Sequence, residues 1–190
     1  MKIAVIDFKS MLSQNVFDTL KDINVEYDVF DNDLDINLLK DYDGIIFTGS
    51  HDHVYEDGSR SIDIRIFDLN KPILGVCYGH QLVHHLLGGE VCKANSDEIG
   101  SVLINTSDSK LFKDLPNKHH VYMYHSDEVV GMAEGFNKIA ETDMCFYAAS
   151  ENIDKKIYTI QFHPEAKAND FGKEIYINFI DIVKDNIWKD

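Results

Sequence analysis

Cys77 is the residue of this sequence whose type and position best suit nucleophilic chemistry. The apolar run Ile73–Val76 precedes it and is too short for a helix, which predicts a buried strand. After it, apolar residues recur at helical spacing from Leu82 to Leu87, and a glycine pair then ends the helix. A helix N-terminus stabilises a thiolate and offers N–H groups to an anion. The spacing therefore fits a nucleophile elbow and, equally well, a buried cysteine in a βα turn.

Gly75 and Gly79 lie two residues before and two residues after this cysteine. Small residues at these positions let the backbone turn sharply, so we expect them to form the turn between strand and helix. Such a turn would expose the Cys77 side chain at the carboxyl end of the strand and direct the helix N-terminus toward it.

His163 is expected at the end of another buried strand, which the segment Lys156–Phe162 predicts. Pro164 cannot continue a strand ladder, so the imidazole should lie at the rim of the sheet, and Glu165 follows closely. A cysteine nucleophile needs a base, and the imidazole of that base needs an acceptor for its second nitrogen. On its own, this tripeptide fits a structural histidine in a turn. Together with the elbow, it predicts a Cys-His-Glu catalytic group.

The first half of the chain predicts alternating strands and helices. Short apolar runs predict strands at Lys2–Phe8, Val25–Phe30, Gly44–Thr48 and Ile73–Val76. Helical spacing predicts helices at Ser13–Ile23, around Ile62–Leu69 and directly after Cys77. This alternation favours an α/β fold with a mostly parallel central sheet and helices on both faces. Ligands of such sheets bind at the carboxyl ends of the strands, where Gly49, Ser50 and Cys77 fall.

The second half of the chain predicts an antiparallel or mixed extension of the same sheet. Short strands separated by turn-rich pieces are expected at Glu90–Lys93, Gly100–Asn105, His120–His125, Lys138–Thr142, Cys145–Ala149 and Lys156–Phe162. A final amphipathic helix is expected at Asp170–Trp188. No internal repeat or linker is evident, so we expect residues 1–190 to form a single domain.

The charge of the chain argues against several classes of partner. Its 190 residues include 33 acidic and 18 basic ones, which gives a formal net charge of -15. A phosphate backbone or an anionic membrane would be repelled, so we expect no nucleic acid and no membrane as partner. The cysteines Cys77, Cys92 and Cys145 are odd in number and widely spaced, which predicts no disulfide framework and favours a reducing cytoplasm.

The histidines outside the expected catalytic group do not form a metal-binding motif. Neighbouring histidines would point to different faces of a helix or strand, and this holds for His51, His53, His84, His85, His119 and His120. The sequence also contains no GxxxxGK[ST] loop. We therefore expect no metal and no cofactor, and any ATP-dependent chemistry would have to take place elsewhere.

Two motifs resemble the signatures of the class I, or triad-type, glutamine amidotransferases: GVCYGHQL at 75–82 and QFHPE at 161–165. They occur in the order that is typical of the family, and the resemblance covers the whole chain. The segment Tyr124–Val129 is similar to the SHxDxV segment of the GMP synthase branch. The resemblance implies one flavodoxin-like glutamine amidotransferase domain. It also implies L-glutamine as substrate and a separate ATP-dependent synthetase as partner.

The resemblance further implies a role for each matching residue. Cys77 would attack the side-chain amide carbon of L-glutamine and form a glutamyl thioester, while His163 transfers the protons and Glu165 orients His163. The oxyanion would be held by the backbone N–H groups of Ser50 and Tyr78. Substrate-binding positions would be Gly49, Gln81 and the backbone near His125.

The chain departs from the family at Gly49-Ser50-His51, where Gly-Gly-Pro is usual. Serine retains the N–H but restricts the peptide flip that points it inward, so we expect the oxyanion hole to depend on the loop at 49–59, with activation by a partner. Segments 54–57 and 98–100 also resemble stand-alone γ-glutamyl peptidases. Such a hydrolase, acting on a larger γ-glutamyl compound without a synthetase, is the alternative function. A non-catalytic regulator on the same fold is a third hypothesis.

Overall fold

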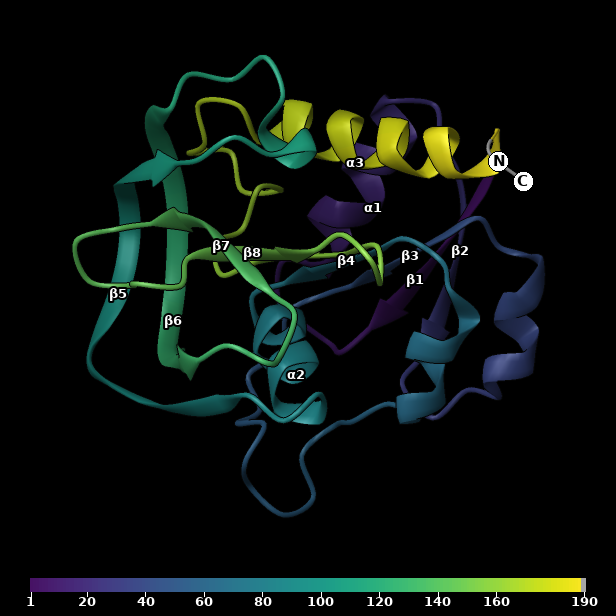
Figure 1. Ribbon diagram of the computed structural model, residues 1–190, viewed down its shortest axis with the longest axis horizontal. Coiled ribbons are helices and arrows are strands. Elements are labelled where there is room, and N and C mark those ends of the chain that lie inside the picture. The colour runs from purple at the N-terminus through teal and green to yellow at the C-terminus, as the bar shows by residue number, and fades with distance from the viewer. Residues whose placement is uncertain (189–190) are drawn as a thin grey trace.

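One nine-stranded sheet carries the fold of residues 1–188, the part of the chain that the computed structural model describes (Figure 1). The strands are β1 Lys2–Asp7, β2 Glu26–Asp31, β3 Gly44–Phe47, β4 Ile73–Val76, β5 Glu90–Thr106, β6 Lys118–Gly131, β7 Asn137–Glu141, β8 Ala149–Asn152 and β9 Ile157–Ile160. Their order is β2-β1-β3-β4-β9-β8-β7-β5-β6. The strands from β2 to β9 in this order are parallel, whereas all later pairings are antiparallel.

Helices cover both faces of the parallel part of the sheet. Helices α1 (Ser13–Asp22) and α3 (Gly172–Ile187) lie on one face, and α2 (Tyr78–Leu86) lies on the other (Figure 1). Each face has its own apolar core, because strands buried on both sides present side chains alternately to the two helical layers. The predicted fold class, a parallel α/β sheet with a mixed extension, is confirmed.

The antiparallel extension differs in detail from the prediction. Instead of short strands, β5 and β6 form one long two-stranded ribbon that stands at the far edge of the sheet (Figure 1). An irregularity between Lys93 and Glu98 accommodates the polar residues that were expected to interrupt the strand. Because one face of this ribbon is exposed, polar residues do not end it. The helix expected around Ile62–Leu69 is a short 3-10 helix, Ile64–Leu69.

The strand predicted at Cys145–Ala149 is wrong for most of its length, since the chain turns there and β8 begins only at Ala149. The hydroxyl of Thr142 accepts hydrogen bonds from the backbone N–H groups of Met144 and Cys145, at 3.2 and 2.8 Å. A threonine that binds the backbone two or three residues further on stabilises a turn rather than a strand.

Helices within the described part of the chain are too short or too polar to cross a membrane.

Candidate active site

Cys77 lies at a sharp turn between β4 and α2, as the sequence predicts. Its backbone has φ 53° and ψ -104°, a conformation that is costly for a residue with a side chain. Its N–H donates to the carbonyl of Ile160 at 2.8 Å, which ties the turn to the neighbouring strand β9. The strained residue is therefore the cysteine itself, at the carboxyl end of a parallel strand. This is the geometry of a nucleophile elbow.

The two flanking glycines have a different function from the one predicted. Neither adopts a positive φ. A Cβ atom on Gly75 would lie 2.7 Å from the carbonyl oxygen of Gly79, and a Cβ on Gly79 would lie 2.7 Å from the Cβ of Phe47. These glycines allow α2 to pack closely against β3 and β4, whereas the turn itself is made by Cys77.

His163 and Glu165 form a buried hydrogen-bonded pair beside this turn. The imidazole Nδ1 and the carboxylate Oε1 are 2.7 Å apart, and the Tyr176 hydroxyl on α3 donates to Oε2 at 3.3 Å. The side-chain amide of Asn169 donates to the His163 carbonyl at 2.7 Å and fixes the backbone there. With Nδ1 bound to the carboxylate, Nε2 is the ring nitrogen that is left for Cys77.

The charges around His163 favour the protonated imidazole. Burial lowers its pKa, but the charges of Cys77 and Glu165 and hydrogen bonds to both outweigh the burial, so the pKa of His163 lies well above its usual value. A thiol and an imidazole in this arrangement can exchange a proton to give a thiolate and an imidazolium.

Glu165→Gln is expected to destabilise the fold more at low pH than at high pH. Because the native pKa of His163 is raised, its protonation stabilises the fold fully below the unfolded pKa of about 6.5, and this contribution is lost as the pH rises through the native pKa. The variant removes the carboxylate that favours the charged ring. Urea denaturation should show a loss in free energy of unfolding of about 1–3 kcal/mol near pH ~6 that shrinks steadily above pH ~7. A loss that grows with pH would contradict the raised pKa.

The loop after β3 forms the opposite wall of the site. Gly49 packs so closely that a Cβ atom on it would lie 3.1 Å from Cε1 of the His163 ring. The hydroxyl of Ser50 accepts from the N–H of Asp52 at 3.2 Å. The loop is closed by Asp52, which accepts from the backbone N–H of Arg60 at 2.9 Å and pairs with its guanidinium at 2.8 Å.

The loop is also fastened to β6 through the buried carboxylate of Asp127. His53 Nδ1 lies 2.5 Å from one oxygen of this carboxylate, and the Tyr55 hydroxyl donates to the other at 2.9 Å. The hydrogen bond to Asp127 raises the pKa of His53. Sequence patterns could not reveal these contacts, because the partners are more than 70 residues apart.

A cavity of about 280 Å³ opens above the cysteine. The predicted site residues that line it are Ser50, Cys77, Gln81, His125 and His163. Gly49, Tyr78 and Glu165 are buried next to these lining residues. Exposed apolar side chains form part of its mouth, namely Met11, Ile99 and Tyr124, and of these the sequence analysis did not single out Met11. Met11 lies in the loop that follows the carboxyl end of β1, and this position is the signal that could have found it.

The sequence profile described as glutamine amidotransferase class-I matches residues 4–183. The chain belongs to the class I glutamine amidotransferase family. The prediction of a glutamine amidotransferase enzyme is thereby confirmed.

Curated relatives of this amidotransferase include GMP synthases. "GMP synthase [glutamine-hydrolyzing]" of Macrococcus caseolyticus is 40% identical over 180 residues, which are 94% of this chain and 35% of that protein. The protein of the same name from Staphylococcus carnosus is 39% identical over the same shares. The chain thus spans about a third of the length of these relatives. The predicted resemblance to the GMP synthase branch is confirmed.

Solved structures agree with this placement. A Thermoplasma acidophilum protein, provisionally described as one of the subunits of GMP synthase, superposes with a TM-score of 0.91 at 28% identity and covers 100% of this chain and 98% of its own. A glutamine amidotransferase from Thermotoga maritima has a TM-score of 0.75 at 19% identity, over 100% of this chain and 84% of its own, which shows the shared fold.

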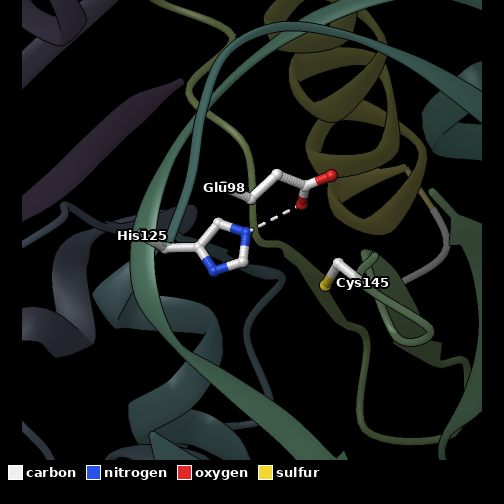
Figure 2. A group of neighbouring side chains, drawn as sticks. All are labelled: Glu98, His125 and Cys145. Atoms are coloured by element: carbon white, nitrogen blue, oxygen red, sulfur yellow. Dashed lines mark hydrogen bonds and ion pairs between the residues drawn. The ribbon is translucent and has the colours of Figure 1, made fainter. Parts of the chain in front are cut away.

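The amidotransferase contains a second Cys-His-Glu cluster, which the sequence analysis did not anticipate. Glu98, His125 and Cys145 are buried, and one ligand-type atom from each lies within 4.8 Å of the others (Figure 2). His125 Nε2 faces Glu98 Oε2 at 3.0 Å, while its Nδ1 donates to the Asp127 carbonyl at 2.9 Å. The other oxygen of Glu98 accepts from Thr142 at 2.8 Å.

A thiol, an imidazole and a carboxylate could together hold a transition metal, but the imidazole and the carboxylate already have hydrogen-bond partners within the protein. Both ring nitrogens of His125 and both oxygens of Glu98 have partners, so the two side chains form a buried hydrogen-bonded link that joins β5 to β6. Burial, followed by the charge of Glu98, raises the pKa of the Cys145 thiol. The cluster therefore provides neither a thiolate nor a free base, and the expectation of no metal stays a prediction.

Proposed function

We propose that this chain is the glutaminase component of a GMP synthase and hydrolyses the side-chain amide of L-glutamine to glutamate and ammonia. The observation that carries the proposal is that the strained Cys77 lines the same cavity as His163, whose ring is hydrogen-bonded to Glu165, in a chain 40% identical to GMP synthases. We take residues 1–190 as one domain.

The reaction begins at the sulfur of Cys77. Its proton passes to Nε2 of His163, and the thiolate adds to the amide carbon of glutamine. The resulting oxyanion is held by backbone N–H groups, for which we propose Ser50 in the facing loop and Tyr78. Tyr78 suits this role because it is the first residue of α2, where helical N–H groups lack partners within the helix.

Product release uses the same imidazole twice. The imidazolium of His163 protonates the departing nitrogen, which leaves as ammonia while the glutamyl thioester remains on Cys77. The neutral imidazole then removes a proton from water, which attacks the thioester and frees glutamate. Glu165 holds the ring in place through Nδ1 and stabilises its charged form. For substrate binding we propose Gly49, Gln81 and the backbone near His125.

The ammonia acceptor requires a second active site. We propose a separate ATP-dependent synthetase as partner, since the fold covers 98% of a chain that is provisionally described as one of the subunits of GMP synthase. We also propose a cytoplasmic location, which fits cysteines that are all free, namely Cys77, Cys92 and Cys145.

Ammonia release separates this function from its alternatives. The chain should release ammonia from L-glutamine, and the rate should rise when the purified synthetase of the same organism is added with Mg-ATP and XMP, but not when heat-denatured synthetase is added. Rapid cleavage of γ-glutamyl peptides by the isolated chain would instead show the stand-alone hydrolase. If the chain turns over neither substrate, with or without the synthetase, the result would support a non-catalytic regulator.

A further inference from the structure

A buried chain of two side-chain amides leads from strand β6 to the sulfur of Cys77. Nε2 of Gln81 donates to the backbone carbonyl of Asp127 at 2.9 Å and to Oε1 of Gln161 at 3.2 Å. Nε2 of Gln161 in turn lies 3.7 Å from the sulfur of Cys77. Both glutamines are buried, and Gln161 is completely inaccessible to solvent.

Strand pairing places Gln161 beside the nucleophile. Val76 pairs with Ile160 in the parallel register of β4 and β9, so the next residue on each strand is Cys77 on one side and Gln161 on the other. The hydrogen bond from the Cys77 N–H to the Ile160 carbonyl holds the two strand ends together at this point. Gln161 also comes two residues before His163, so both side chains reach the sulfur from the same strand end.

The direction of the amide chain follows from its first member. A backbone carbonyl can only accept hydrogen bonds, so the NH₂ group of Gln81 must face Asp127. The second hydrogen of this NH₂ group then requires an acceptor, and Oε1 of Gln161 provides it. This orientation leaves the NH₂ group of Gln161 facing sulfur, so an N–H donor is directed at Cys77.

We propose that Gln161 is a third functional group at the nucleophile, whose amide N–H stabilises the thiolate of Cys77. The proposal rests on the proposed role of Cys77. A neutral thiol is a weak acceptor, so a buried amide facing it gains little, whereas a thiolate makes a charge-assisted hydrogen bond. A purely structural pair of amides would not need its last donor to face sulfur.

The donor acts at two steps of the reaction. When the thiol proton moves to Nε2 of His163, the negative charge that remains on sulfur is shared with the Gln161 N–H. In the thioester the sulfur carries no charge, so the contact weakens. When water has added and the carbon–sulfur bond breaks, the electron pair returns to sulfur and the N–H stabilises the leaving thiolate.

The pH dependence of Cys77 alkylation by iodoacetamide, followed by mass spectrometry of its peptide, tests this role without requiring turnover. Gln161→Met keeps the size of the side chain but removes the donor, and the alkylation midpoint should rise by about one pH unit. Gln161→Glu places a carboxylate oxygen against the sulfur and should raise the midpoint by about two units or more. Glutamine turnover near pH ~7 should fall about tenfold with Gln161→Met.

Thr159→Val is the matched control, because Thr159 is buried on the same strand and bonds to His80 and Ser150 rather than to Cys77. It should leave the alkylation midpoint unchanged. Unchanged alkylation midpoints in both Gln161 variants would overturn the proposal. If Gln161→Glu does not fold, the midpoint of Gln161→Met alone decides. If Cys77 of the wild type is alkylated no faster than the buried Cys145, the proposed function itself fails.

Discussion

Replacing Cys77 with alanine is expected to reduce glutamine hydrolysis by a factor of about 10⁴ or more while the fold persists. The sulfur forms the only covalent bond to substrate in the proposed reaction, and loss of a nucleophile leaves only binding and oxyanion contacts. Cys77 belongs to one apolar core but also lines the cavity, and alanine removes only its sulfur, so circular dichroism and the urea midpoint should change little. Ammonia release measured with a coupled dehydrogenase gives the rate.

Cys145→Ala is the informative control, because this thiol also has a histidine and a glutamate beside it (Figure 2). Both nitrogens of His125 are occupied by Glu98 and the Asp127 carbonyl, so no base faces the Cys145 sulfur. The variant should lose about 1 kcal/mol of stability and keep its activity within a few-fold. If Cys145→Ala is inactive and Cys77→Ala still hydrolyses glutamine, the nucleophile is Cys145 of the second cluster rather than Cys77.

Gly172→Ala is expected to cause the largest loss of stability of any glycine-to-alanine substitution near the site. A Cβ atom there would lie 1.9 Å from the carbonyl oxygen of Pro164 and 3.0 Å from its carbon. Both are backbone atoms, so either the start of α3 or the segment that carries His163 and Glu165 must move. We expect a loss of about 3 kcal/mol or more in urea denaturation.

Activity should fall as well, because the displaced segment holds His163, the proposed catalytic base. At a temperature where the variant is still folded, kcat should drop at least about tenfold, as small displacements of reacting groups are costly. Gly131→Ala on β6 serves as control: its nearest neighbour would be an ordinary contact at 3.4 Å, so stability should hardly change. A fully stable and active Gly172→Ala variant would show that the backbone yields at this point.

Local sequence patterns were sufficient to predict the local structure around the proposed catalytic residue Cys77, because this structure is defined by neighbours along the chain. The strand, the turn and the helix around Cys77 follow from hydrophobic spacing, whereas β9 ends at Ile160 and so is shorter than the strand expected up to Phe162. The role of Gly75 was misjudged, since close packing against α2 is a tertiary contact and the positive φ belongs to Cys77. Spacing cannot distinguish these two uses of a glycine.

Contacts between distant segments could not be derived in the same way. The hydrogen bonds from His53 and Tyr55 to Asp127 depend on where the tertiary fold places β6 relative to the loop after β3. Nothing in the spacing of Glu98 and Cys145 indicates that they meet beside His125. The turn that carries Cys145 depends on the hydroxyl of Thr142. The prediction of a strand there gave more weight to the strand propensity of the residues than to this turn-forming side chain.

Asp127 belongs to two walls of the cavity at once. Its carboxylate anchors the loop through His53 and Tyr55, whereas its carbonyl oxygen orients Gln81. A redesign that widens the cavity for larger γ-glutamyl compounds therefore cannot treat the mouth and the floor as independent parts. Changes confined to the exposed residues Asp57 and Gly58 leave the anchor in place. Substitution of Asp127, or displacement of its backbone, would alter entrance and nucleophile together.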